Sequence, residues 1–170
     1  MANRAISRKS GKPAAKQKAS KRLTLKATTK AAEPSAYIVF ISHSSKEKWI
    51  ARQIAKEIEA LGAKTWLDLK DIHGGDEIRR SIRRGIRASK EAIVLLSANS
   101  VTSDWVIYEV AIADAQGKRI TPVLNNLSSD DVFSPLRGIK AVDLNDFNTF
   151  LVELAERIKN RLGRARKAAL

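Results

Sequence analysis

A single carboxylate lies in the most apolar helical stretch of the chain. Residues 105 to 113 read WVIYEVAIA, and Glu109 is the only charged residue among them. Helical spacing places Trp105 one turn before Glu109 on the same face. Burying a carboxylate in an apolar helix is costly unless a partner or solvent stabilises it. Two interpretations follow: Glu109 is a functional acid beside an indole ring, or it forms a structural ion pair with an arginine of the preceding helix.

Three further groups of polar residues follow stretches that have the composition of buried strands. In parallel α/β sheets, ligands bind just beyond the carboxyl ends of the strands. The groups are Ser42, His43, Ser44 and Ser45 after a first apolar run, Asp68 and His73 after a second, and Ser97 after a third. Serine hydroxyls and the free N–H groups of a helix start suit a phosphate. For Asp68 we favour a structural role as a turn or cap acceptor.

Several other chemistries lack the residues they need. Two histidines without a carboxylate cluster at ligand spacing do not predict a metal site, and the chain contains no cysteine. Neither a GxxxxGK[ST] loop nor a GxGxxG turn occurs, which disfavours ATPase and classical dehydrogenase activities. A phospho-receiver domain of similar topology would carry an aspartate where this chain has Ser97. We therefore expect no metal site and none of these three functions.

Five arginines form a stripe on one predicted helix, opposite the isoleucines that recur every four residues. The stripe consists of Arg79, Arg80, Arg83, Arg84 and Arg87, and the apolar face of Ile78, Ile82 and Ile86. A solvated outer face is the simplest interpretation of such a pattern, and a surface for an anion or a partner protein is the alternative.

Strands and helices alternate along the body of the chain. Short, mostly apolar runs predict strands at 37–41, 63–68, 92–96, 120–124 and 139–144. Helical periodicity and capping residues predict helices at 44–61, around 78–86, at 104–116 and at 145–162. Ser44 with Glu47 three residues later forms a capping box for the first of them. The connection at 130–138 is too short and too rich in turn residues for more than one helical turn.

This alternation predicts an α/β fold with a parallel sheet covered on both faces. Right-handed crossovers leave few topologies for five strands, and the flavodoxin-like, doubly wound order 2-1-3-4-5 is favoured among them. Its switch point falls between the first and third strands, where the chain presents Ser42 to Ser45 and the residues from Ser97 onward. The elements thus bring the polar groups to one edge.

The chain's net charge of +14 is concentrated at its two ends. Residues 1–34 hold ten Lys or Arg and one acidic residue, residues 157–170 hold six and none, and residues 35–156 hold 16 against 17. The first 34 residues have too few large apolar side chains to bury a core. We predict a disordered basic arm at 1–34, a single folded domain at 35–162 and a basic tail at 163–170.

The expected cellular compartment is inferred only from features that the sequence lacks. It contains no apolar run long enough for a secretory signal or a membrane span. The basic first segment is lysine-rich rather than arginine-rich and has little apolar periodicity, so an organelle transit peptide is disfavoured. The absence of cysteine is compatible with the cytoplasm. A cytoplasmic protein without membrane contact is the expectation.

Several motifs in order resemble the Toll/interleukin receptor (TIR) domain family over residues 36–160. The first is YIVFISHS at 37–44, the second is WLD at 66–68 before a loop with Gly74 and Gly75, and the third is IVLLS at 93–97. Ser103, Trp105 and Glu109 complete an S-x-W-x-x-x-E pattern. Each motif is weak alone, but together at family spacing they are specific.

The resemblance implies an NAD⁺ hydrolase of the bacterial type, which cleaves the bond between nicotinamide and ribose. The family's essential glutamate falls on Glu109 and its helix tryptophan on Trp105. The polar residues of the switch point would then contact substrate, and NAD⁺ would be the substrate rather than a cofactor. The implied substrate-binding residues are Ser42, His43, Ser44, Ser45, Asp68, His73, Ser97 and Trp105.

The resemblance also implies assembly with other TIR domains, as a homo-oligomer or filament on activation. The family's assembly and gating loop falls on Asp71, Ile72, Gly74, Gly75 and Asp76. Two other functions stay open. One is a non-enzymatic adaptor that recruits TIR domains, and the other is binding of nucleic acid or another anionic partner through residues 1–34.

Overall fold

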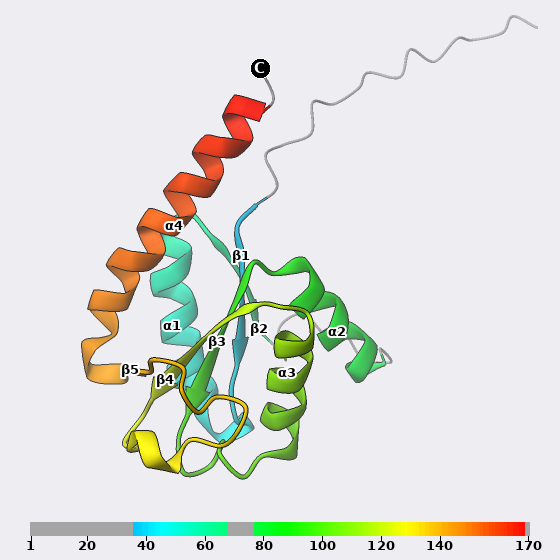
Figure 1. The fold of residues 1–170 in the computed structure, drawn as a ribbon, viewed down its shortest axis with the longest axis vertical. Coiled ribbons are helices and arrows are strands. Elements are labelled where there is room, and N and C mark those ends of the chain that lie inside the picture. The colour runs from blue at the N-terminus through cyan, green and yellow to red at the C-terminus, as the bar shows by residue number, and fades with distance from the viewer. Residues whose placement is uncertain (1–35, 68–76, 169–170) are drawn as a thin grey trace, which may run out of the picture. The chain divides into compact units, whose positions relative to one another are not determined.

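A computed structural model describes residues 36–67 and 77–168 (Figure 1). The predicted basic arm at 1–34 lies outside the described residues. So do Asp68, His73 and the whole proposed assembly loop: Asp71, Ile72, Gly74, Gly75 and Asp76. Every element below belongs to one compact unit within residues 32–170.

Five parallel strands form the sheet in the order β2-β1-β3-β4-β5, as the sequence predicts. The strands are β1 (Ile38–Ser42), β2 (Lys64–Leu67), β3 (Glu91–Leu96), β4 (Arg119–Leu124) and β5 (Val142–Asp143). All six residues of β3 are buried, which explains the apolar run at 92–96 in this central strand. Ser42, the last residue of β1, pairs with Val94 of β3, two residues before that strand ends.

Helices cover both faces of the sheet (Figure 1). One core cluster joins α1 (Lys48–Ala60) and α4 (Phe147–Ala168) to the face that carries Val39 and Ile41. The other joins α2 (Ile78–Ala88) and α3 (Asp104–Ala115) to the face that carries Phe40. The doubly wound α/β architecture is therefore confirmed, and alternate residues of β1 serve different cores.

Two predicted elements have other bounds in the structure. The fifth strand is confined to Val142–Asp143, and the predicted length 139–144 is wrong because Ile139 follows the turn at Gly138 (φ +86°) and is 38% exposed. The last helix continues to Ala168 instead of ending at residue 162, and Gly163 lies within it. The predicted tail at 163–170 is thus helical through Ala168.

The start of the first helix also differs from the simple capping box. Ser44 caps a short 3-10 turn, Ser45–Glu47, by accepting a hydrogen bond from the Lys46 N–H, and α1 begins at Lys48. The connection between β4 and β5 holds one 3-10 turn, Ser129–Asp131, as expected for its length. Within the described ranges, we find no helix that is long and apolar enough to cross a membrane.

Candidate active site

The carboxylate of Glu109 points from α3 into the protein and meets the end of β1. Ser103 caps α3 by accepting a hydrogen bond from the Val106 N–H, which fixes the helix start. Glu109 is 1% exposed, and the Ser42 hydroxyl donates a short hydrogen bond to its Oε2 atom. The structure thus joins two residues that are 67 positions apart in the sequence and both belong to the predicted site.

Strand parity explains why Ser42 faces Glu109. Phe40 of β1 packs in the same core as α2 and α3, and Ser42 lies two residues further along on the same face. Ser42 is itself 1% exposed. A hydrogen bond to a buried carboxylate stabilises its charged form, because the hydroxyl replaces part of the lost hydration.

Trp105 packs against a neighbouring aromatic ring and is not fully buried. It is partly buried and stacks on Tyr108, with ring centroids 5.7 Å apart. The guanidinium of Arg79 in α2 lies 5.8 Å from the centre of the Tyr108 ring. Although the sequence of α3 is apolar on nearly all sides, the helix is not buried all round, since Ile107 is 37% exposed.

The loops after β1 and β3 are tied together at the switch point. The Ser97 hydroxyl accepts a hydrogen bond from the Asn99 N–H at 3.1 Å, and the Ser100 hydroxyl accepts one from the Ser97 N–H at 2.6 Å. Lys46, in the loop after β1, donates from Nζ to Asn99 Oδ1 at 3.3 Å. Ser97 therefore shapes its own loop, and its hydroxyl serves as a turn acceptor.

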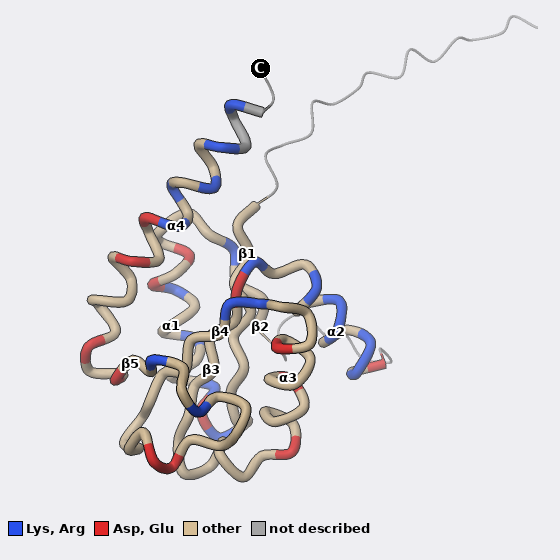
Figure 2. The backbone as a smooth tube through the Cα atoms, in the orientation of Figure 1, with Lys and Arg blue, Asp and Glu red and all other residues tan. Residues whose placement is uncertain are grey.

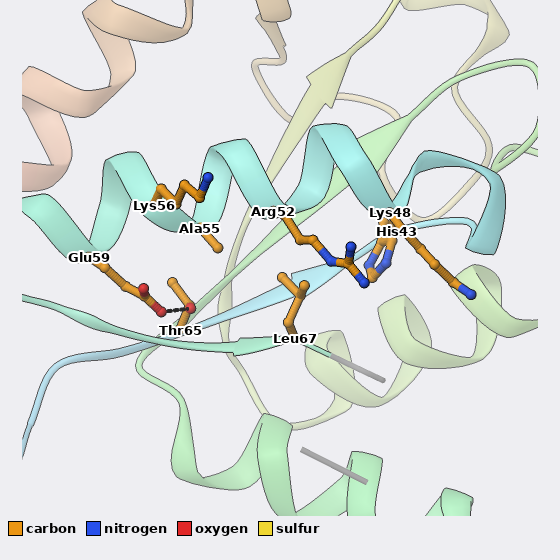
Figure 3. Close-up of a pocket in the computed structure, with 8 residues that line it drawn as sticks. All are labelled: His43, Lys48, Arg52, Ala55, Lys56, Glu59, Thr65 and Leu67. Carbon is orange, nitrogen blue, oxygen red and sulfur yellow. Dashed lines mark hydrogen bonds between the residues drawn. The ribbon is translucent and has the colours of Figure 1, made fainter. Parts of the chain in front are cut away.

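A cavity of about 410 Å³ lies between α1 and the edge strand β2 (Figure 3). Three cations on successive turns of α1 line it, together with the apolar Leu67 of β2. Its lining residues are His43, Lys48, Arg52, Ala55, Lys56, Glu59, Thr65 and Leu67. A hydrogen bond from the Thr65 hydroxyl to Glu59 closes one end (Figure 3). The cavity is therefore electropositive along α1 and apolar where Leu67 lines it.

His43 lines this cavity, and the residue before it, Ser42, contacts the Glu109 carboxylate. It is 4% exposed, its Nδ1 lies 3.4 Å from the Ile41 carbonyl oxygen, and it lines the cavity on the α1 side. The preceding residue, Ser42, holds Glu109 on the α3 side. Because the sheet separates these two sides, a ligand can reach both only across the carboxyl end of β1.

Other predicted residues have the following places. Ser44 is buried and caps the turn after β1, and Ser45 is exposed there. All five arginines of the α2 stripe are exposed side chains, consistent with a solvated outer face. Among the described residues, no group of three His, Cys, Asp or Glu could hold a metal ion. Sequence reasoning missed Lys48 and Arg52, although basic residues four positions apart on α1 were the available signal.

Five parallel strands in this order form a flavodoxin-like α/β domain, with the Glu109 carboxylate held at the carboxyl end of β1 and a cavity between α1 and β2. The sequence profile of the TIR domain matches residues 39–165. The chain therefore belongs to the TIR domain family. A solved TIR domain, that of the Toll-related receptor TRR-2 from Hydra magnipapillata, superposes with a TM-score of 0.59 at 19% identity. It covers 72% of this chain and 96% of its own, which supports the fold.

Two curated relatives carry names that state an activity. The 2' cyclic ADP-D-ribose synthase AbTIR of Acinetobacter baumannii is 32% identical over 135 residues, which are 74% of this chain and 50% of that protein. The NAD(+) hydrolase TcpC of Escherichia coli is 33% identical over 103 residues, 56% of this chain and 33% of that protein. The chain thus spans half or less of the length of these two relatives.

Proposed function

We propose that this chain is a TIR-domain NAD⁺ hydrolase, which releases nicotinamide and ADP-ribose or a cyclic isomer. The observation that carries the proposal is the Glu109 carboxylate, 1% exposed and held by Ser42 at the carboxyl end of β1. Relatives that are about one-third identical are named NAD(+) hydrolase and 2' cyclic ADP-D-ribose synthase. A buried carboxylate at the switch point of the sheet is the group that this chemistry requires.

The bond that breaks explains why one carboxylate is enough. When the C1′–N bond breaks, its electron pair moves onto the nicotinamide ring, which leaves as a neutral molecule and needs no general acid. An ordinary glycoside needs a second carboxyl group for that step. Positive charge develops at the ribose, and an anion in a poorly solvated site stabilises that charge more than it stabilises the ground state. Glu109 supplies this anion or holds the ribose hydroxyls.

The reaction is completed when a nucleophile adds to C1′. A water that adds its oxygen loses a proton and gives ADP-ribose, whereas an internal nucleophile of the substrate gives a cyclic product. In this proposal Trp105 offers an aromatic face to the substrate and excludes water. We propose Ser97 as a further substrate contact, together with Asp68 and His73, which lie outside the described residues.

We propose that the pyrophosphate of the substrate, and the part of the substrate beyond it from the nicotinamide, bind in the cavity beside α1. Lys48 and Arg52 line it, and their charges attract phosphate. The hydroxyls of Ser44 and Ser45 are the nearest neutral side-chain donors before α1, whereas the N–H groups of Lys46 and Glu47 are already bonded to Ser44. His43 belongs to the cavity wall, so a substrate there passes over the end of β1 toward Glu109.

We further propose that activity depends on self-association, with residues 71–76 as the assembly and gating loop. Leu67 lines the cavity, and residues 68–76 follow it directly in the chain. Closure of a loop over a site excludes water and completes the catalytic arrangement. Residues 1–34 remain a proposed basic arm for an anionic partner, and the cytoplasm remains the expected compartment.

Replacing Glu109 tests the activity directly. We expect Glu109→Gln to lower the rate of nicotinamide release by at least about 100-fold, because the amide keeps the shape but not the charge. Chromatography of NAD⁺ incubations measures the loss and identifies the product. The far-UV spectrum and the sedimentation of the variant must match those of the wild type. Wild-type protein that leaves NAD⁺ intact even when concentrated would favour the non-enzymatic adaptor.

A further inference from the structure

A second concave site lies at the opposite, amino-terminal end of the sheet. A pocket of about 340 Å³ is lined by Tyr37, Lys90, Arg157, Asn160, Arg161 and Arg164. Four of these six residues are cations, the other two carry a hydroxyl and an amide, and none is acidic. The guanidinium, ammonium and amide groups are hydrogen-bond donors, so this lining fits an anion.

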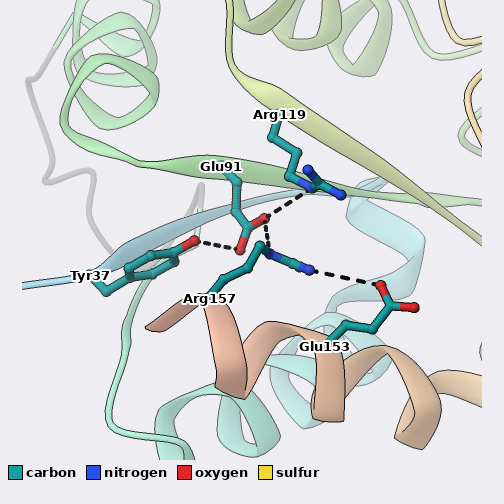
Figure 4. Close-up of polar contacts among 5 residues, drawn as sticks. All are labelled: Tyr37, Glu91, Arg119, Glu153 and Arg157. Carbon is teal, nitrogen blue, oxygen red and sulfur yellow. Dashed lines mark hydrogen bonds and ion pairs between the residues drawn. The ribbon is translucent and has the colours of Figure 1, made fainter. Parts of the chain in front are cut away.

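Two residues of the pocket, Tyr37 and Arg157, contact the buried carboxylate of Glu91, which Arg119 also approaches (Figure 4). Glu91 is 2% exposed and accepts a hydrogen bond from the Tyr37 hydroxyl at 3.0 Å. Its Oε2 lies 3.2 Å from Arg157 Nε and 3.9 Å from Arg119 Nε. One carboxylate is thus set between two cations, and Lys90 and Arg161 of the surrounding surface add further positive charge.

One cation of the pocket, Lys90, also affects the neighbouring Lys118. Lys118 donates from Nζ to the carbonyl oxygens of Arg87 and Ser89, at 3.0 and 2.6 Å. Burial lowers the pKa of Lys118, and the charge of Lys90 lowers it further. Cations held close enough to repel one another are costly for folding, and a bound polyanion relieves that cost.

The spacing of the arginines along α4 indicates the length of ligand that the pocket fits. Arg157, Arg161 and Arg164 share one face of α4 and span about 10 Å along its axis at about 1.5 Å per residue. The last turns of α4 carry cations in succession (Figure 2). A nucleic acid strand carries one phosphate per about 3.4 Å of helix axis, so several phosphates match this span. Tyr37, the pocket's aromatic residue among those described, is 6% exposed and offers no face for a base.

We propose that this pocket binds the phosphate backbone of a nucleic acid strand without reading its sequence. Lys90, Arg161 and Arg164 make the phosphate contacts, and Asn160 adds a neutral donor. Arg157 is already paired with Glu91 and Glu153, so we assign it no phosphate contact. This site belongs to the folded domain and is distinct from the arm at 1–34 and from the edge that carries Glu109.

The experiment measures binding of a fluorescein-labelled single-stranded DNA of about 20 nucleotides to the full chain by fluorescence anisotropy at several salt concentrations. The test variant is Arg161→Gln with Arg164→Gln. Each lost phosphate contact reduces the slope of log affinity against log salt by about 0.7. We therefore expect the slope to fall by about 1.4 and the affinity at about 0.1 M salt to fall roughly 20-fold.

A matched control separates the pocket from net charge. Arg80→Gln with Arg83→Gln removes the same charge from the exposed face of α2, and both double variants keep residues 1–34. We expect the control to keep the wild-type slope and both proteins to keep the wild-type circular dichroism. Equal losses in the two variants, or no loss in either, would overturn the proposal. Binding of ATP but not of the oligonucleotide would overturn it as well.

Discussion

The Ser42 hydroxyl holds one oxygen of the Glu109 carboxylate, so the orientation of that carboxylate depends on it. We expect Ser42→Ala to lower kcat for NAD⁺ cleavage by about 10- to 100-fold, since a hydrogen bond to a charged group contributes about 1.5–3 kcal/mol. KM should change little if Ser42 acts by positioning Glu109 rather than by binding substrate. Steady-state kinetics measure both constants.

Ser89 provides the control for this substitution. It is also 1% exposed, and its hydroxyl donates to the Gly85 carbonyl oxygen at 2.8 Å, far along the chain from the proposed site. Ser89→Ala removes a comparable buried hydroxyl and should leave kcat unchanged. If both variants lose activity in proportion to their loss of stability, the positioning role of Ser42 is wrong.

Tyr37 makes stability depend on pH in the alkaline range. Burial raises the pKa of Tyr37 to about 12, and the charge and hydrogen bond of Glu91 contribute to this rise, against the lowering effect of Arg157. A pKa that is higher in the folded state than in the unfolded state stabilises the fold below pH 10. That contribution is lost as pH rises from about 10 through about 12.

Tyr37→Phe isolates this contribution. At neutral pH the variant should be less stable by about 1–3 kcal/mol, because Glu91 loses the hydroxyl that donates to it. The difference from the wild type should shrink between about pH 10 and pH 12. Urea unfolding at several pH values measures it. A difference that stays constant across that range would contradict the assigned pKa.

At the scale of elements, the packing of α2 on the sheet depends on one close approach. A Cβ atom placed on Gly85 would lie 2.4 Å from Trp66 Cε2, and the Trp66 ring is itself stacked on Phe40 with centroids 4.9 Å apart. The ring cannot move aside without losing this stack. Any side chain at Gly85 therefore pushes α2 away from β2.

Two Gly→Ala variants separate this packing from helix propensity. Alanine stabilises a helix interior by about 0.8–1.0 kcal/mol relative to glycine. A Cβ atom placed on Gly163 in α4 would meet nothing within 4 Å, so Gly163→Ala should raise the free energy of unfolding by up to about 1 kcal/mol. Gly85→Ala should lower it by about 1–3 kcal/mol, as overpacking does. Urea denaturation of both variants gives the comparison, and equal signs would contradict it.

The order of the strands could be predicted because burial leaves a local signal. β3 is buried at every position and reads as an unbroken run up to Leu96, and right-handed crossovers then restrict the topology. The extent of β5 could not be predicted, because Ile139 has strand composition but no strand partner in the sheet. Pairing, not composition, decides where an edge strand begins.

The sequence indicated the carboxyl edge of the sheet and Glu109 as a candidate site, but it did not indicate the contacts made there. The isolation of Glu109 in an apolar helix marked it without any structure. Its hydrogen bond to Ser42 depends on the packing of α3 against β1, which local spacing does not encode. The role of Lys48 and Arg52 in the cavity depends likewise on where α1 lies over β2. The neighbourhood of Trp105 with Tyr108 follows from helix spacing alone.

At the scale of the whole folded unit, the two proposed sites lie at opposite ends of the sheet. The carboxyl end holds the buried Glu109, and the amino end holds the cationic pocket whose Tyr37 and Arg157 contact Glu91. β1 connects them, and its five residues span about 17 Å at about 3.3 Å each. Charges this far apart are largely screened at physiological salt, so the two sites should respond independently to substitution.

The proposed self-association concerns the whole molecule and is tested on the 170-residue chain. If copies of the domain complete one another's sites, the rate of NAD⁺ cleavage per molecule must rise with protein concentration. Mass action then predicts that specific activity falls steeply below the dissociation constant of the assembly. Sedimentation and NAD⁺ consumption should be measured on the same dilution series. Glu109→Gln, which alters only a buried side chain, serves as the control and should sediment like the wild type. A monomer with full specific activity at the lowest concentration would show that each domain completes its own site.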